Sequence, residues 1–305
     1  MSNLLPAIEG LGTIWQVEVF DKIDDKTAEV AYGDLRSFIE AFEAKYSRFK
    51  TDSIITQLND TGVMTNPEPE TLALLRLGQK LYEDTGGVFN FLVGGILEAR
   101  GYDANYSFSP IDWTNEMPSP ARDLVIDDNE IRLINGKVDL GGFGKGWLID
   151  QVIERLLTQH SIKHCLVNGG GDIYATSDHG EPIDIYLEHP IKAGTYIAKT
   201  TLTDQGFAAS STHKRRWKSG EQDYSHIVDT TAEGVPAGCA KGAPGGDPDH
   251  RGIYVKAPSA VIADAWSTTL LISPPNLHQN SLEIAGVSFS ILNTEDNTLE
   301  SSHNF

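Results

Sequence analysis

The sequence changes from a strand pattern to a helix pattern at Val138-Asp139-Leu140-Gly141-Gly142-Phe143-Gly144-Lys145-Gly146. Apolar side chains then recur at helical spacing through Trp147–His160. A strand that ends in a glycine-rich turn before a helix presents backbone amides to an anion. The turn is neither a Walker motif nor a dinucleotide fingerprint, because Gly146 and Trp147 stand where those motifs require Ser/Thr and Gly. The segment therefore predicts either an anion-binding turn or a tight strand–helix turn without a ligand.

Patterns on both sides of this turn predict a mixed α/β fold in a single domain that spans residues 1–305. Strands rich in β-branched and aromatic residues are expected at Thr13–Phe20, Ile131–Leu133, Cys165–Val167, Ile183–Leu187, Ile253–Val255 and Val287–Leu292. Helices are expected at Leu35–Tyr46, Glu70–Thr85, Trp147–His160 and Ala260–Ile272. Turn-rich stretches at Asp103–Pro120 and Ala237–Arg251 predict two long surface loops.

The composition limits the classes of function. The chain has 305 residues and a formal net charge of −19, which opposes non-specific binding to nucleic acid or to an anionic membrane. Two cysteines, Cys165 and Cys239, are too few for a disulfide scaffold or a four-cysteine zinc site. We find neither a signal peptide nor an apolar run long enough to span a membrane. The prediction is a cytoplasmic protein, or an exported or membrane-associated one whose leader has been removed.

Two more motifs have the residue types of a ligand site. Three glycines and Asp172 follow the strand at Leu166-Val167-Asn168, which indicates a ligand contact or a β-turn between two strands. Asp264 and Thr268 are four residues apart in a predicted helix, so their oxygens project from one face. Hard oxygen ligands of this kind suit Mg²⁺. The alternative for Asp264 is a carboxylate that interacts with the helix dipole.

A histidine and a basic run lie in the second half of the chain. Tyr224-Ser225-His226-Ile227-Val228-Asp229 has a strand pattern, and its imidazole has an ordinary pKa near neutrality, as a general base requires. The alternative is a histidine hydrogen-bonded for structural reasons. Just upstream, His213-Lys214-Arg215-Arg216 is either a phosphate-steering patch or a solvated hairpin tip.

Together these motifs resemble the ApbE family, the FAD:protein FMN transferases. The similar segments occur in the family's order along nearly the whole chain. They are Gly12-Thr13, Tyr46-Ser47-Arg48-Phe49 with Asp52-Ser53 and Leu58-Asn59, Gly86-Gly87-Val88-Phe89-Asn90 with Val93-Gly94, Asp139-Leu140-Gly141-Gly142 with Lys145-Gly146, Asn168-Gly169-Gly170-Gly171-Asp172, Ser225-His226-Ile227-Val228-Asp229, and Ala257-Pro258-Ser259 through Asp264 and Thr268.

The resemblance implies a T-fold-type domain with mixed sheets flanked by helices. It also implies a Mg²⁺-dependent enzyme that splits FAD and transfers FMN to a Thr or Ser hydroxyl of an acceptor protein, releasing AMP. The acceptor in such families is a redox-complex subunit. Matched to the family's motifs, the metal ligands are Gly142 (through its carbonyl), Asp264 and Thr268, and the catalytic residues are His226 as base and Asp264. The FAD-contact positions are Leu11, Val88, Phe89, Asn90, Asp139, Lys145 and Ile227.

Two positions depart from the family's pattern. Asn90 replaces the usual Asp after Phe, and Thr230 replaces the usual Pro after Asp229. The same site would also serve an FAD pyrophosphatase that releases free FMN and AMP with water as the nucleophile. A non-catalytic FAD-binding protein is a third interpretation, which the retained metal ligands oppose.

Overall fold

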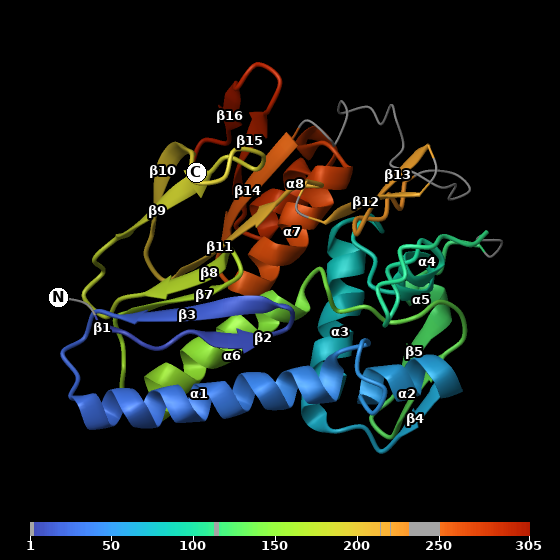
Figure 1. Cartoon of the computed structure of the whole chain (residues 1–305), viewed down its shortest axis with the longest axis horizontal. Helices are drawn as coiled ribbons and strands as arrows, with labels where there is room; N and C mark the ends of the chain where they lie inside the picture. The colour runs from blue at the N-terminus through green and yellow to red at the C-terminus, as the bar shows by residue number, and fades with distance from the viewer. Residues whose placement is uncertain (1–2, 113–115, 214, 220, 232–250) are drawn as a thin grey trace.

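A nine-stranded sheet organises the computed structural model, which describes residues 3–112, 116–213, 215–219, 221–231 and 251–305. Figure 1 shows this sheet on the side of the molecule where both chain ends lie. Its strands follow the order β1-β3-β7-β8-β11-β14-β15-β16, and β2 also pairs with β3. Their bounds are β1 Asn3–Leu4, β2 Ile8–Gly10, β3 Thr13–Val19, β7 Cys165–Gly169, β8 Asp172–Thr176, β11 Gln205–Ser210, β14 Arg251–Ala257, β15 Ser288–Asn293 and β16 Leu299–Ser301.

The paired strands of this sheet run antiparallel. The predicted mixed α/β fold is confirmed. The resemblance implies sheets with both parallel and antiparallel pairs, but the strand ladders among the described residues are antiparallel. For the closely connected pairs β2–β3, β7–β8 and β15–β16 the short connection dictates this direction, because two residues can join antiparallel neighbours whereas parallel strands need a long crossover. Gly170 and Gly171 join β7 to β8 with positive φ angles of 79° and 106°. This glycine run is thus a hairpin turn, the structural alternative of the two.

Helices cover one face of the sheet and surround the main hydrophobic core. In Figure 1, α1 and α6 lie along the sheet, and α7 crosses beside β11 and β14. Trp15, Phe143 and Leu35 are among the largest fully buried side chains of this layer. The helices are α1 Asp25–Tyr46, α2 Ile54–Thr61, α3 Pro69–Asp84, α4 Gly94–Ala99, α5 Pro120–Asp123, α6 Gly144–Gln159, α7 Ala260–Ile272, the 3₁₀ helix η2 Pro275–Leu277 and α8 Gln279–Ile284. Among the described residues, no helix is both long enough and apolar enough to cross a membrane.

A smaller lobe stands beside the large sheet and contains α2 to α5 (Figure 1). A three-stranded sheet and the β12–β13 hairpin also belong to it in that view. The β9–β10 hairpin instead contributes to a separate apolar cluster with β8 and β11. The remaining strands are β4 Val63–Thr65, β5 Leu124–Ile126, β6 Glu130–Leu133, β9 Ile183–Glu188, β10 Tyr196–Leu202, β12 Arg216–Ser219 and β13 Gln222–Ser225.

The N-terminal ends of α6 and α7 meet at Gly146. A Cβ placed on Gly146 would lie 2.5 Å from the carbonyl oxygen of Ala260, so only glycine permits this approach. One turn further along α6, the carboxylate of Asp150 accepts the N–H groups of Ala260 (2.8 Å) and Val261 (3.0 Å). Asp150 therefore satisfies backbone donors at the start of α7 that its own helix cannot pair.

The six strands and four helices expected from periodicity are confirmed, with differences at their ends. Helix α1 begins at Asp25, ten residues before the predicted start, because Asp24 accepts the N–H of Thr27 as an N-cap. Helix α6 begins at Gly144, because the chain is already turning at Leu140, whose carbonyl accepts the N–H of Gly144. The predicted loop at 103–120 is confirmed for the described residues before α5, which begins at Pro120. Residues 113–115 are not among the described residues. The loop predicted at 237–251 lies outside the described residues except for Arg251.

We expect Gly146→Ala to destabilise the protein by about 1–3 kcal/mol, because the new methyl group overlaps the backbone of α7. The matched control is Gly33→Ala in α1, where nothing lies within 4 Å of the added Cβ and helix propensity favours alanine. Thermal unfolding of both variants measures the difference. Equal melting temperatures for Gly146→Ala and the parent would contradict this account of the α6–α7 contact.

Candidate active site

A lysine between two buried aspartates lies at the α6–α7 contact. Lys145 forms ion pairs with Asp172 at the start of β8 and with Asp264 in α7, the latter at 3.4 Å between Nζ and Oδ2. Asp264 also accepts the backbone N–H of Gly146 at 3.2 Å. Both aspartates are about 95% buried, with exposed fractions of 5% and 4%. The structure thus joins three segments separated by up to 119 residues into one charged cluster.

Burial and like charge shape the proton affinity of this cluster. Burial raises the pKa of Asp264, and the neighbouring carboxylate of Asp172 raises it further, while Lys145 and the N–H of Gly146 oppose the rise. Burial by itself would lower the pKa of Lys145, but the two carboxylates raise it above its ordinary value. One ammonium group therefore pairs with two carboxylates. With both carboxylates ionised, the cluster carries one more negative than positive charge.

Gly142, Phe89 and Thr268 lie close to one another. A Cβ on Gly142 would be 3.0 Å from the ring of Phe89 and 3.9 Å from the hydroxyl oxygen of Thr268. Thr268 is one helical turn beyond Asp264 in α7 and is half-buried. The structure therefore brings the three predicted metal-ligand residues, Gly142, Asp264 and Thr268, into one neighbourhood.

The glycine-rich turn is not a cradle of free amides. Its N–H groups at Gly141, Gly144 and Gly146 donate to Asp139, Leu140 and Asp264. The N–H of Phe143 also donates to the carbonyl of Leu140, at 3.2 Å. These four groups favour the second predicted alternative, a tight strand–helix turn, because their N–H groups already have acceptors in the turn or, for Gly146, in α7. Side chains such as Lys145 must supply most of the positive charge.

The predicted FAD-contact residue Asp139 is held on both of its oxygens. Arg48, from the loop between α1 and α2, forms a salt bridge to Oδ2, and the N–H of Gly141 donates to Oδ1 at 2.6 Å. The side chain of Arg48 is 3% exposed and that of Asp139 is 11% exposed. Because each carboxylate oxygen has two lone pairs, Asp139 keeps acceptor capacity toward a ligand.

His226 lies just after β13 and not within a strand. The predicted strand over Tyr224–Asp229 is therefore wrong beyond Ser225. β13 ends there because its partner β12 begins at Arg216, which pairs with Ser225. His226 is half-buried, and its Nδ1 lies 3.4 Å from the carbonyl oxygen of Arg215. Burial lowers its pKa to about 4, and the charge of Arg215 contributes.

The segment after His226 is tied to the smaller lobe. The carbonyl of Ile227 accepts a hydrogen bond of 3.0 Å from Arg100 at the end of α4. The side chain of Ile227 packs against the apolar cluster around Trp266. The hydroxyl of Thr230 donates to the carbonyl of Val88 at 2.6 Å. Thr230, a departure from the family's pattern, thus links the histidine segment to the predicted FAD-contact residues Val88 and Phe89.

The last two predicted contact residues, Leu11 and Asn90, have structural roles in the described chain. Leu11 has a positive φ of 51° in the turn between β2 and β3, and it packs against the main core. Asn90 is 9% exposed and uses both ends of its amide, donating to the carbonyl of Pro118 (2.7 Å) and accepting from the N–H of Leu92 (2.9 Å).

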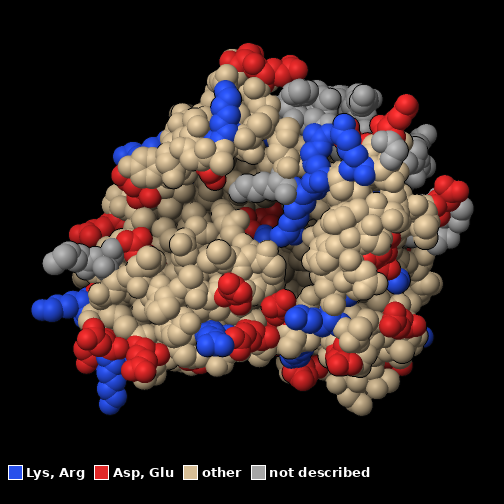
Figure 2. Space-filling view, in the orientation of Figure 1, with Lys and Arg blue, Asp and Glu red and all other residues tan. Residues whose placement is uncertain are grey.

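The basic run upstream is not at a hairpin tip. Arg215 precedes β12, and its guanidinium donates to the hydroxyl of Tyr102 at 3.1 Å, while Arg216 is the first residue of β12. Lys214 lies outside the described residues. Figure 2 shows Lys and Arg side chains running down into a hollow between the two parts of the molecule, with carboxylate side chains at its floor.

Two residues of the site were not among our predicted site residues. Asp172 directly follows the glycine hairpin that the sequence shows, so an acidic residue after three glycines was the available signal. Arg48 lies within one of the family-like segments, but its salt bridge to Asp139 spans 91 residues, and neither periodicity nor spacing reports such a contact.

The oxygens around Asp264 fit a hard divalent cation. In the described part of the chain, no three His, Cys, Asp or Glu side chains form a metal-binding group. A cation here would instead use the carboxylate of Asp264, the hydroxyl of Thr268 and the backbone of Gly142, with Asp172 nearby. Oxygen donors of this kind suit Mg²⁺, which usually keeps several waters and takes one or two carboxylates. The excess of carboxylate over ammonium in the cluster agrees with a site for a cation.

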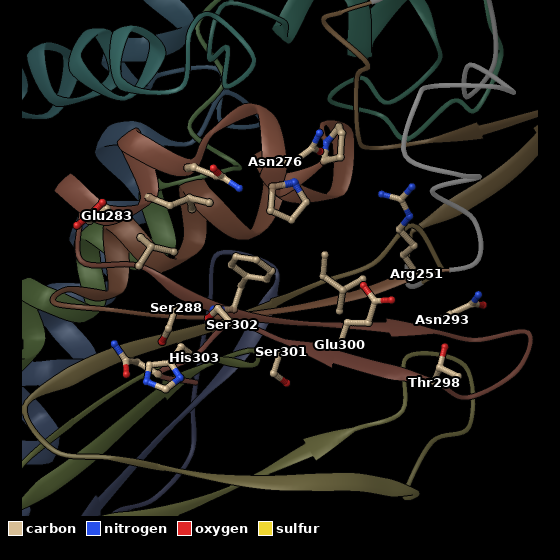
Figure 3. Close-up of a pocket in the computed structure, with 18 of the residues that line it drawn as sticks. Arg251, Asn276, Glu283, Ser288, Asn293, Thr298, Glu300, Ser301, Ser302 and His303 are labelled. Atoms are coloured by element: carbon tan, nitrogen blue, oxygen red, sulfur yellow. The ribbon is translucent and has the colours of Figure 1, made fainter.

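A separate groove of about 1120 Å³ lies at the far end of the sheet. Figure 3 shows Arg251 of β14, Glu300 of β16 and Thr298, just before β16, lining this groove, with Asn276 across from them. None of the predicted site residues is among the described residues that line it. The groove is therefore distinct from the Lys145 cluster.

We expect Asn90→Asp, which restores the family's usual residue, to destabilise this protein by about 1–3 kcal/mol. The carboxylate would face the carbonyl oxygen of Pro118 across a contact of 2.7 Å, where the amide now donates. Denaturant unfolding measures the loss, and Asn129→Asp at an exposed turn is the control. A variant as stable as the parent would contradict the structural role of Asn90.

Comparisons with known proteins identify the family of this chain. A sequence model of the ApbE family matches residues 11–287. An FAD:protein FMN transferase of Klebsiella pneumoniae (strain 342) is 23% identical over 303 residues, covering 91% of this chain and 81% of that protein. The one from Escherichia coli (strain K12) is 22% identical over 315 residues, covering 95% and 84%.

Solved structures show the same fold. The ApbE protein of Thermotoga maritima matches with a TM-score of 0.81 and 22% identity, covering 99% of this chain and 97% of that one. The apo form of the flavinyl transferase ApbE of Pseudomonas stutzeri matches with a TM-score of 0.77 and 19% identity, covering 100% and 96%. Since the family model spans most of the sequence and the fold agrees, this chain belongs to the ApbE family.

Proposed function

We propose that this chain transfers the FMN moiety of FAD to a Thr or Ser hydroxyl of an acceptor protein in a Mg²⁺-dependent reaction that releases AMP. The acceptor we propose is a redox-complex subunit, as the family resemblance implies. The observation that supports the proposal most is the cluster of Lys145 with Asp172 and Asp264, beside Gly142 and Thr268. Relatives named FAD:protein FMN transferase support the same reaction.

Charge is the main problem that the site must solve. A pyrophosphate is strongly anionic and the protein has a net charge of −19, so the substrate needs local positive charge. Lys145 supplies one such charge, but its two carboxylate partners offset it, so the site needs a divalent cation as well. Bound Mg²⁺, held by Asp264, Thr268 and the carbonyl of Gly142, would neutralise phosphate oxygens and stabilise the charge of the transition state.

The reaction replaces one phosphorus–oxygen bond with another. The acceptor oxygen bonds to the FMN phosphorus, the bond from that phosphorus to the AMP oxygen breaks, and AMP departs. We assign the hydroxyl proton to His226. Because a carbonyl oxygen only accepts, Nδ1 of His226 donates to Arg215, which leaves Nε2 with the free lone pair. A pKa of about 4 keeps the imidazole neutral at neutral pH, so Nε2 can take a proton, but it makes His226 a weaker base than an imidazole with its ordinary pKa.

We expect Asp264→Asn to reduce Mg²⁺-dependent cleavage of FAD at least ~10²-fold, since it removes the charged metal ligand without changing side-chain size. Release of AMP across a Mg²⁺ titration measures the effect. Asp34→Asn is the control, because Asp34 is also an ion-paired aspartate, bonded to Arg155 at the surface. Unchanged cleavage in Asp264→Asn would remove Asp264 from the metal site.

We expect His226→Gln to slow transfer on the order of 10²-fold while the FAD dissociation constant stays nearly unchanged, because the acceptor hydroxyl is absent from the FAD complex.

The pH dependence of protein stability gives a second measurement on the same variant. The pKa of His226 is about 4 in the folded protein against an ordinary 6.5, so the unfolded chain binds more protons between these values. The free energy of unfolding of the parent therefore falls as pH drops from about 6.5 to about 4.

The His226→Gln variant should lack this part of the pH dependence, which denaturant unfolding at pH 7 and pH 5 measures. His179→Gln, at a largely exposed histidine, is the control and should keep it. A destabilised His226→Gln variant with normal transfer would remove His226 from the mechanism.

Intact-mass analysis tests the proposed function as a whole. A candidate redox-complex subunit is incubated with the enzyme, FAD and Mg²⁺, and a mass gain equal to FMN less one water supports transfer. Free FMN and AMP without a mass gain indicate the pyrophosphatase. Bound FAD without Mg²⁺-dependent AMP release indicates the non-catalytic binding protein.

A further inference from the structure

Arg48 is a buried arginine that holds the predicted FAD-contact residue Asp139. Its Nε forms the salt bridge to Asp139, its Nη2 donates to the carbonyl of Tyr102 at 3.0 Å, and its guanidinium lies 4.2 Å from the ring centre of Phe49. A buried arginine costs free energy unless its charge and N–H groups are satisfied. The pairing with Asp139 is therefore what makes this position tolerable.

The contact continues from Asp139 into the glycine-rich turn. The second oxygen of Asp139 accepts the N–H of Gly141 at 2.6 Å. The next residue, Gly142, is the one that lies against Phe89 and Thr268. Arg48, Asp139 and Gly141 thus form a chain of polar contacts from the α1–α2 loop to the backbone beside the predicted metal ligands.

Arg48 has no surface with which to touch a ligand. Its side chain is 3% exposed, and its buried Nη1 has no hydrogen-bond partner, with Glu98 the nearest carboxylate at 3.9 Å. Asp139 is more exposed, at 11%. An effect of Arg48 on the substrate must therefore pass through Asp139.

We infer that Arg48 is a positioning residue for the FAD site, which fixes the carboxylate of Asp139 and through it the turn at Gly141 and Gly142. This inference rests on the proposed function, because Asp139 is an FAD contact only there. Without Arg48, the carboxylate of Asp139 loses its charged partner, and its hydrogen bond to the N–H of Gly141 is no longer held in place. The consequence is a looser site for FAD without a change in any group that contacts it directly.

A double-mutant cycle on the FAD dissociation constant tests the inference. We expect Arg48→Gln to weaken FAD binding on the order of tenfold, as loss of a single buried contact commonly does. Asp139→Asn should weaken binding as well. The double variant Arg48→Gln/Asp139→Asn should be no worse than the weaker-binding single variant, because both act through one carboxylate. Arg76→Gln, at an exposed salt bridge with Asp128, is the control and should bind FAD normally.

The outcomes separate three possibilities. Losses that multiply in the double variant would overturn the inference, since Arg48 would then act independently of Asp139. A lower melting temperature with unchanged FAD affinity in Arg48→Gln would overturn it too, because Arg48 would be structural only. If Arg48→Gln does not fold, Arg48→Lys enters the same cycle, since it keeps the charge but loses the bond to Tyr102. A parent that binds FAD but does not cleave it would refute the proposed function alone, because the cycle measures binding.

Discussion

The close approach of α6 and α7 at Gly146 is the contact on which the site depends. A side chain at this residue would overlap the first residue of α7, so the absence of a Cβ sets the distance between the helices. Asp150 then satisfies the first amides of α7, and Asp264 accepts the N–H of Gly146. The two helices exchange polar contacts at their N-terminal ends, and this places the carboxylate of α7 beside Lys145.

Positively charged side chains are concentrated near the candidate site, although the protein as a whole is acidic. The protein has a large negative net charge, yet Lys145 and Arg48 are ion-paired with residues of the candidate site, and Arg215 hydrogen-bonds to Tyr102. Carboxylates hold two of these cations in place, because buried charges are stable only in pairs. A local balance of this kind lets an acidic protein accept an anionic ligand with the help of a divalent cation.

The departures from the family's pattern are accommodated by local contacts. Asn90 uses an N–H group that aspartate does not have, to bind the carbonyl of Pro118. Thr230 uses a hydroxyl that proline does not have, to bind Val88. Both substitutions thus add a hydrogen bond that ties a loop of the smaller lobe to its neighbours. They change how the contact segments are held, while Lys145, Asp264 and Thr268 are retained.

The sequence by itself determined the class of fold, the main strands and helices, and most of the residues that meet at the site. Apolar periodicity reports which residues face a core, and motifs of glycine and aspartate mark turns and candidate ligands. The sequence did not decide between a ligand-binding role and a structural role for these motifs, because each pattern fits both. The glycine run before Asp172 is such a case, since it forms a hairpin turn and also places the carboxylate.

Only the tertiary structure decided which groups are already satisfied and which remain for a ligand. The turn amides at Gly141, Gly144 and Gly146 are used internally, which the sequence motif did not reveal. The pairing of Arg48 with Asp139 and of Lys145 with Asp172 joins residues far apart in the chain. The physical reason is that hydrogen bonds and desolvation depend on positions in space, whereas periodicity and spacing report only neighbours along one helix or strand.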